Sequence, residues 1–256
     1  MPELLRERRD HTEILTINRP EARNAINGAV SRAFAAAFDE LEADDDCWVV
    51  VLTGRGDKAF SAGMDLKAFD AGEAADIIEA KGGFGGIARR DFPKPIIAAV
   101  NGSALAGGCE IMLACDLVVA VEEAKFGIPE VKRGLMAGGG GLFRLPKRVP
   151  PAIAMELALT GDPIDARRAF ELGLINRVVP AGKLMEEALA LAGSIADNAP
   201  LAVRVSKRVM KQAGELPDAE GWAVNNAAAA EVFGSADAME GSIAFAEKRK
   251  PNWTGK

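Results

Sequence analysis

Three short apolar runs constrain the fold of this 256-residue chain more than any other feature of its sequence. They lie at Cys47–Thr53, Pro95–Val100 and Leu117–Val121. Their apolar residues are continuous rather than alternating, which is typical of strands buried on both faces. The segments around and between them favour helices, at Gly107–Ala114 and from Gly28 onward. This alternation predicts an α/β fold, in which helices cover a parallel sheet.

The two ends of the chain follow different patterns. Leu4 to Ile17 predicts two strands joined by a charged turn. Beyond Pro150, Ala and Leu with helical spacing dominate, and only Leu174–Val179 is typical of a strand. We therefore expect residues 1–161 to form an α/β core with the active site and residues 162–256 to form a helical subdomain, with the boundary near Gly161–Asp165.

The residue counts exclude several kinds of catalysis. The only histidine is His11 in a polar stretch near the N-terminus, and the chain has no tyrosine. A histidine-rich zinc site cannot be built from one imidazole. Cys47, Cys109 and Cys115 are an odd number at no metal-ligand spacing, so they are expected to be reduced core residues. Proton transfers would then depend on carboxylates, lysines or water, and we expect no metal site.

Charge and hydropathy limit the partners. The formal net charge is −6 and aromatic residues make up 5% of the chain, a poor composition for binding nucleic acid. No window approaches 18 uncharged apolar residues, so we expect no membrane span. The N-terminal sequence is charged where a signal peptide needs apolar residues, which predicts a cytoplasmic location.

Small residues follow two of the predicted strands. Gly54–Ala59 fits the pattern G-x-G-x-x-A, but a further glycine-bearing turn follows it instead of the helix that a dinucleotide site requires. The more informative feature is the pair Ala59–Asp65 and Ala104–Glu110, both rich in small residues. Such segments are either tight strand–helix turns or places where two backbone N–H groups converge on one ligand oxygen.

Two glutamates lie beside small-residue turns of this kind. Glu110 falls in the first turn of the helix that begins at Gly107, and Glu130 follows Pro129. A glutamate in a first helical turn can simply complement the helix dipole. Two such carboxylates can instead form an acid/base pair if burial raises the pKa of one of them.

The motifs taken together, in their order and spacing, resemble those of the crotonase, or enoyl-CoA hydratase/isomerase, family. The similarity runs from about Leu4 to Arg249. The segments that carry it are Asn18–Arg19–Pro20 with Asn24–Ala25, Ala59–Leu66, Lys94–Gly102, Gly107–Glu110, Phe126–Glu130 and Gly138–Gly141.

This resemblance implies a crotonase-like spiral of βαβ units with a helical C-terminal subdomain that joins subunits into a homotrimer or a dimer of trimers. It implies that the backbone N–H groups of Ala62 and Gly107 bind a thioester oxygen, and that Glu110 and Glu130 act on water. It also implies a CoA thioester as substrate, with no other cofactor. The residues that would bind substrate or CoA are Arg23, Ala62, Gly63, Met64, Asp65, Leu66, Gly107, Phe245 and Lys248.

Because both glutamates are present, the resemblance favours a hydro-lyase of lipid metabolism that reversibly adds water to 2-trans-enoyl-CoA, giving 3-hydroxyacyl-CoA. The segments Gly82–Phe84 and Ala244–Trp253 look like the carnitinyl-CoA dehydratase branch, which is one alternative. Isomerisation by a single glutamate is another, and a non-catalytic binding protein would be expected to lose a glutamate or gain a basic face. Ala106 and Ala137 stand where the family often has glycine and proline, which leaves the acyl preference open.

Overall fold

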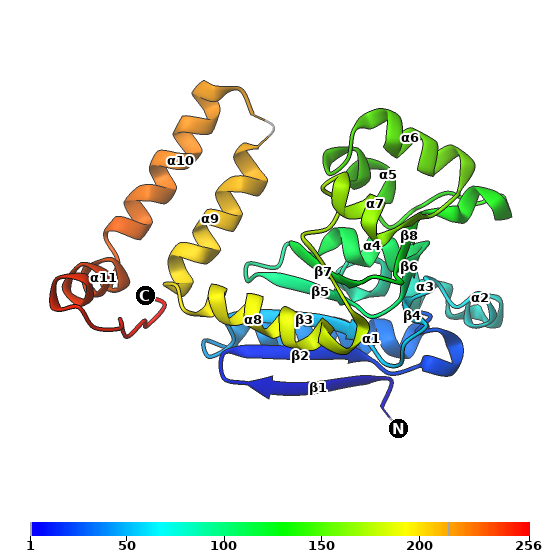
Figure 1. The fold of residues 1–256 in the computed structure, drawn as a ribbon, viewed down its shortest axis with the longest axis horizontal. Helices are drawn as coiled ribbons and strands as arrows, with labels where there is room; N and C mark the ends of the chain where they lie inside the picture. The colour runs from blue at the N-terminus through cyan, green and yellow to red at the C-terminus, as the bar shows by residue number, and fades with distance from the viewer. Residues whose placement is uncertain (1, 215) are drawn as a thin grey trace.

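The computed structural model describes residues 2–214 and 216–256, and its larger sheet contains the predicted apolar runs. Its strand order is β1-β2-β3-β5-β7-β10, and every neighbouring pair is parallel except the antiparallel hairpin of β1 and β2. Figure 1 shows these strands stacked from the N-terminal hairpin upward. The strands are β1 Leu4–Arg9, β2 Thr12–Ile17, β3 Val49–Gly54, β5 Ile96–Val100, β7 Leu117–Val121 and β10 Arg177–Val179.

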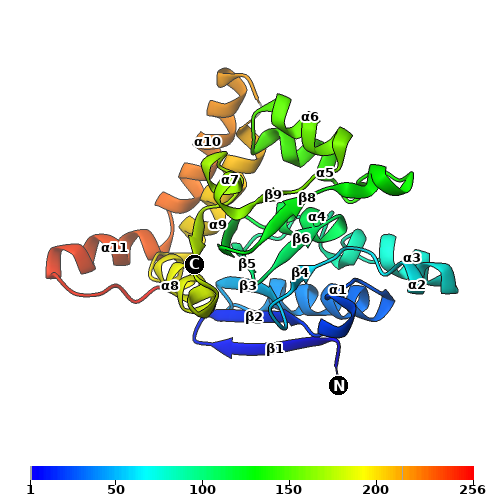
Figure 2. The ribbon, with the colours of Figure 1, turned by 45° about the vertical axis from the view of Figure 1, so that its right-hand side comes forward.

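A smaller second sheet makes the chain a spiral. Each of β3, β5 and β7 is followed at once by a short strand of this sheet, which has the order β4-β6-β8-β9. Each turn of the chain therefore contributes one strand to each sheet before a helix or loop returns to the next turn (Figure 2). The short strands are β4 Ala59–Ser61, β6 Ser103–Leu105, β8 Lys125–Gly127 and β9 Ile164–Asp165.

Helices enclose the two sheets. α8 packs across β2, β3, β5 and β7, and α4 packs against β4 and β6. The predicted helix from Gly28 is α1, whose apolar residues Val30, Phe34, Phe38 and Leu41 are fully buried. The helices up to residue 196 are α1 Gly28–Ala43, α2 Leu66–Ala68, α3 Ala74–Ile78, α4 Gly107–Ala114, α5 Gly141–Arg144, α6 Pro151–Thr160, α7 Ala166–Glu171 and α8 Leu184–Ala196.

The last three helices do not cover either sheet, although Lys207 of α9 donates to Lys94 O and Asp116 Oδ2, just before β5 and β7, at 2.6 Å each. α9 Pro200–Ala213 and α10 Asp218–Phe233 pack side by side, and α11 Ala236–Glu247 lies farthest from the small sheet (Figures 1 and 2). Residues 164–196 still belong to the core, because they supply β9 and β10 to the sheets and α8 to their cover. The domain boundary near residue 161 stays a prediction, but α8 is still packed on the larger sheet, and the helices stop covering the sheets only after it.

The sequence-based strand at Leu174–Val179 is too long by three residues. Only Arg177–Val179 pairs with β7. Leu174 N–H instead donates to Ala169 O at the end of α7, and the Asn176 side chain accepts from Val118 N–H at 2.8 Å. The three cysteines are buried and form no disulfide, as expected. In the described part of the chain, no helix has the length and apolarity to cross a bilayer.

Candidate active site

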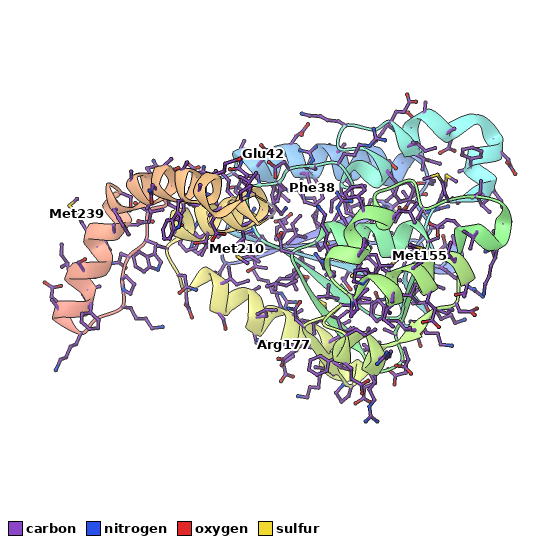
Figure 3. All side chains as sticks on the ribbon, turned by 90° about the horizontal axis from the view of Figure 1, so that it is seen from above. Phe38, Glu42, Met155, Arg177, Met210 and Met239 are labelled. Atoms are coloured by element: carbon purple, nitrogen blue, oxygen red, sulfur yellow. The ribbon has the colours of Figure 1, made fainter. Side chains whose placement is uncertain are left out.

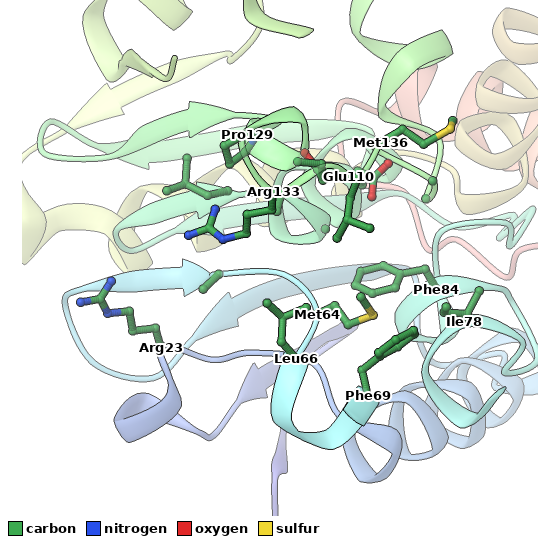
Figure 4. A pocket seen from close by; sticks show the side chains of 18 of the residues that line it. Arg23, Met64, Leu66, Phe69, Ile78, Phe84, Glu110, Pro129, Arg133 and Met136 are labelled. Carbon is green, nitrogen blue, oxygen red and sulfur yellow. The ribbon is translucent and has the colours of Figure 1, made fainter. Parts of the chain in front are cut away.

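A cavity of about 490 Å³ lies between the small sheet and the turns that follow its strands. Glu110 and Glu130 both line it, as do the small-residue segments after β4 and β6. In Figure 4, Arg23 and Arg133 lie toward one end and Phe84, Ile78 and Met136 toward the other. Most of the wall is apolar, so a polar group there acts in a poorly solvated space.

Glu110 is held by a glycine loop. It lies in the first turn of α4 and is 3% exposed. Its Oε1 accepts from the N–H of Gly141 at 2.9 Å, and a Cβ on Gly139 would lie 2.7 Å from its Oε2. Burial raises the pKa of Glu110, and the surrounding backbone N–H groups act in the opposite direction. The loop therefore fixes the carboxylate in position and supports its charged form.

Glu130 lies in a different environment. It belongs to the 3₁₀ turn Pro129–Arg133, and its Oε2 is buried without a hydrogen-bond partner among the described residues. Burial is the largest cause that raises the pKa of Glu130 to about 7, and the charge of Glu110 contributes. N–H groups therefore support the charge of one carboxylate, while the pKa of its neighbour near 7 lets that neighbour carry a proton, the asymmetry that an acid/base pair needs.

The backbone N–H groups that are free at the site belong to Met64 and Gly107, whereas the resemblance implied Ala62 and Gly107 as donors. Ala62 N–H donates to Arg23 O at 3.0 Å, so it is already committed within the protein. The N–H of Ile26 donates to Gly63 O, and Ile26 O accepts from Asp65 N–H. These two bonds form a parallel β-bridge between Ile26 and Met64, so the N–H of Met64 points away from Ile26. Neither Met64 N–H nor Gly107 N–H has a protein acceptor among the described residues.

Two glycines bring these donors together. Gly63 has φ +89°, and a Cβ there would lie 2.7 Å from Gly107 N. A Cβ on Gly107 would lie 2.4 Å from Cζ of Phe84. Ala106, in contrast, takes φ +52° without being glycine, a conformation that costs an L residue energy. The backbones at 63 and 107 thus approach each other closely, as two N–H donors to one oxygen atom require.

Residues 9–256 match the Enoyl-CoA hydratase/isomerase family along almost the whole chain. The chain belongs to this family. It is 43% identical to the carnitinyl-CoA dehydratase of Salmonella typhi over 247 residues, which is 94% of each chain. The crystal structure of an enoyl-CoA hydratase from Mycobacterium tuberculosis H37Rv has 54% identity and a TM-score of 0.95, with all of both chains covered. A carnitinyl-CoA hydratase from Mycobacterium avium has 48% identity and a TM-score of 0.80 over the same coverage.

The enoyl-CoA hydratase/isomerase family motifs meet at the cavity only in part. Of the binding residues that the resemblance implied, five line it: Arg23, Ala62, Met64, Leu66 and Gly107. Gly63 shapes it through its backbone, whereas the Asp65 carboxylate accepts from Arg19 Nη2 at 2.9 Å and caps α2. For Asp65 this indicates a structural role instead of contact with the ligand.

Phe245 and Lys248 do not reach the cavity of their own chain. Both lie at the C-terminal end of α11, on the opposite side of the molecule from the small sheet (Figure 1). Phe245 is 88% exposed, which is unusual for a large apolar side chain. The predicted contact of these two residues with CoA is possible only in a neighbouring subunit's site and stays a prediction.

Sequence reasoning missed several residues of the cavity. Phe84 belongs to the glycine-rich turn 82–86, which carried no catalytic residue type, and Met136 lies in an irregular loop. Arg89 and Arg133 are exposed arginines with no side-chain hydrogen bond or ion pair among the described residues. The spacing of Arg133 three residues after Glu130 was the only signal that would have placed it here.

Proposed function

We propose that this protein is an enoyl-CoA hydratase, which reversibly adds water to a 2-trans-enoyl-CoA to give the 3-hydroxyacyl-CoA. The observation that carries the proposal is the pair of carboxylates, Glu110 and Glu130, in one apolar cavity beside two free N–H groups. The names of the enoyl-CoA hydratase and carnitinyl-CoA dehydratase relatives support the same reaction class.

The thioester carbonyl oxygen would lie opposite the N–H groups of Met64 and Gly107. Negative charge develops on this oxygen when water adds to the conjugated double bond. Donors fixed in advance stabilise that charge without reorganising, and one donor of this kind is typically worth about 10²–10³ in rate. The glycines at 63 and 107 allow the approach that a side chain would block.

The two glutamates would then transfer protons on either side of the double bond. As the water oxygen bonds to Cβ, one of its protons passes to the Glu110 carboxylate. Glu130, whose pKa of about 7 lets it carry a proton, gives that proton to Cα. The reaction leaves the pair with one proton in total, now on Glu110. Because the carboxylates supply both transfers, we propose that the reaction needs no metal or redox cofactor.

The pH dependence follows from this shared proton. The active enzyme carries one proton on the pair, and the pKa of Glu130 at about 7 sets where the pair loses it. We expect kcat/KM for crotonyl-CoA to fall as the pH rises through about 7. Hydration consumes no net proton, so the equilibrium constant is independent of pH, and kcat/KM for dehydration should fall along the same curve. Steady-state assays in both directions test this, and a level profile across that range would contradict it.

An absorbance assay tests the proposed function itself. Hydration of crotonyl-CoA removes the conjugated enoyl-thioester absorbance, whereas isomerisation of a 3-enoyl-CoA creates it. We expect rapid loss of absorbance with crotonyl-CoA. Activity confined to the 3-enoyl substrate would instead assign the chain to the isomerases of the family.

We also propose that the chain works as a homotrimer or a dimer of trimers. The helices α9–α11 carry large apolar side chains that are exposed to solvent in the single chain. These side chains are Met210, Trp222, Phe233, Met239, Ile243 and Phe245. Figure 3 shows one of them, Met239, on the part of the chain that lies away from the packed core. Light scattering at micromolar concentration should give a multiple of the 26.9 kDa chain mass, three or six times, and a monomer would contradict the proposal.

A further inference from the structure

The two ends of the active-site cavity differ in chemistry. At one end Arg23 also lines a neighbouring cavity of about 310 Å³ together with Lys58, which suits the phosphates of CoA. The other end is walled by Phe84, Ile78 and Met136 (Figure 4). With the thioester opposite Met64 and Gly107, the acyl group would extend toward this second end.

Arg89 lies at the acyl end. Its side chain packs over Gly83, next to Phe84, so that a Cβ on Gly83 would lie 2.6 Å from Arg89 Cγ. Arg89 lines the active-site cavity and also a further cavity of about 560 Å³ beyond it. In the described part of the chain its guanidinium has no hydrogen-bond or ion-pair partner, although five N–H donors are available.

The cavity beyond Arg89 is rich in basic side chains. Among the described residues, six basic side chains line it against two acidic ones, Asp91 and Asp116, and one of the six, Arg90, is paired with Asp39 at 2.8 Å. Asp116 is already paired with Lys207 at 2.6 Å and with Lys211 at 3.5 Å. A cationic acyl terminus would meet repulsion here, and an anionic one would be attracted. The six basic residues are Arg89, Arg90, Arg144, Lys147, Arg148 and Lys211.

We infer that the acyl group of the substrate ends in a carboxylate, which Arg89 binds at the entrance to the basic cavity. The inference rests on the proposed hydratase function and names its substrate class: a 2-enoyl-CoA whose chain carries a terminal carboxylate. The same charges disfavour a trimethylammonium terminus. The inferred substrate therefore differs from the carnitinyl-CoA in the name of the Salmonella relatives. Because Arg89 is exposed, a bound carboxylate keeps part of its hydration and the cost of desolvation is small.

Binding of saturated CoA thioesters tests the inference without relying on catalysis. Calorimetry compares adipyl-CoA with hexanoyl-CoA and suberyl-CoA with octanoyl-CoA, pairs of equal chain length that differ in the terminal carboxylate. In Arg89→Gln, which keeps the Cβ and Cγ that pack over Gly83, the preference for the carboxylate member of at least one pair should drop by about two- to fivefold, the scale of an exposed ion pair. Arg89→Lys keeps the charge without the planar fork, so its carboxylate preference should lie between that of the wild type and that of Arg89→Gln.

Arg133→Gln is the matched control, because Arg133 lines the same cavity at the other end. It should change the affinity for both members of a pair alike and leave their ratio intact. A carboxylate preference that Arg89→Gln leaves unchanged in both pairs would overturn the inference. Tighter binding by the wild-type protein of the saturated 4-trimethylammoniobutyryl-CoA than of butyryl-CoA would also overturn it. If the protein binds these thioesters selectively but hydrates no enoyl-CoA, the proposed function fails while the assignment of Arg89 stands.

Discussion

Replacing either glutamate by glutamine should lower kcat for crotonyl-CoA by about 10²-fold or more, the scale of a lost acid/base group. Glutamine keeps the shape of the side chain but cannot take or give the proton. The affinity for CoA esters should change little, because the N–H groups of Met64 and Gly107 belong to the backbone. Steady-state kinetics of Glu110→Gln and Glu130→Gln, with binding of a saturated CoA thioester alongside, separate the two effects.

The double variant should lose less than the product of the two single losses, since the residues act as one unit on one water. Glu156→Gln, on the solvent side of α6, is a control for the chemical change itself. If Glu110→Gln retained nearly full hydratase activity, the two-carboxylate mechanism would be wrong and a reaction that uses Glu130 alone would replace it.

The second large effect is expected from the backbone at Met64. Introducing the α-hydroxy analogue of methionine at this position replaces its N–H by an ester oxygen and leaves the side chain unchanged. We expect kcat to fall by about 10²–10³-fold, because one of two oxyanion donors is removed. The measurement is kcat for crotonyl-CoA after semisynthesis or genetic incorporation of the analogue.

The matched control is the same replacement at Ala62, whose N–H donates to Arg23 O. That ester removes one internal hydrogen bond, worth about 0.5–1.5 kcal/mol of stability, so thermal unfolding should shift more than kcat does. A larger loss of kcat at Ala62 than at Met64 would return the oxyanion role to Ala62.

The choice between these two donors shows where sequence reasoning stops. The small-residue motif at 59–65 located the turn, but which of its N–H groups is free depends on the bonds that Ile26 makes to Gly63 and Asp65. Ile26 is far from this motif in sequence, and no local pattern reveals the register in which the two segments pair. The motif therefore identified the segment but not which of its N–H groups is free.

Burial on both faces made the larger sheet predictable, since β3, β5 and β7 are continuous apolar runs. The small sheet was harder to predict because its strands have only two or three residues, too few for any periodicity. The glycine and proline turns drew attention to Glu110 and Glu130, and the family resemblance implied their catalytic role. The cavity residues Phe84 and Arg89 were not predicted to line the site, because a phenylalanine in a glycine-rich turn and a lone arginine are ordinary surface features until the fold places them beside the site.

The most direct test of the central claim, that Glu110 and Glu130 add water across a conjugated thioester, follows the fate of labelled water. Crotonyl-CoA is incubated with the protein in H₂¹⁸O, and the product is analysed by mass spectrometry and fragmentation. We predict 3-hydroxybutyryl-CoA that carries one ¹⁸O on C3, formed by the wild type and about 10²-fold more slowly by Glu110→Gln. Unlabelled crotonyl-CoA recovered intact, while a 3-enoyl-CoA is converted to its 2-enoyl isomer, would contradict the account.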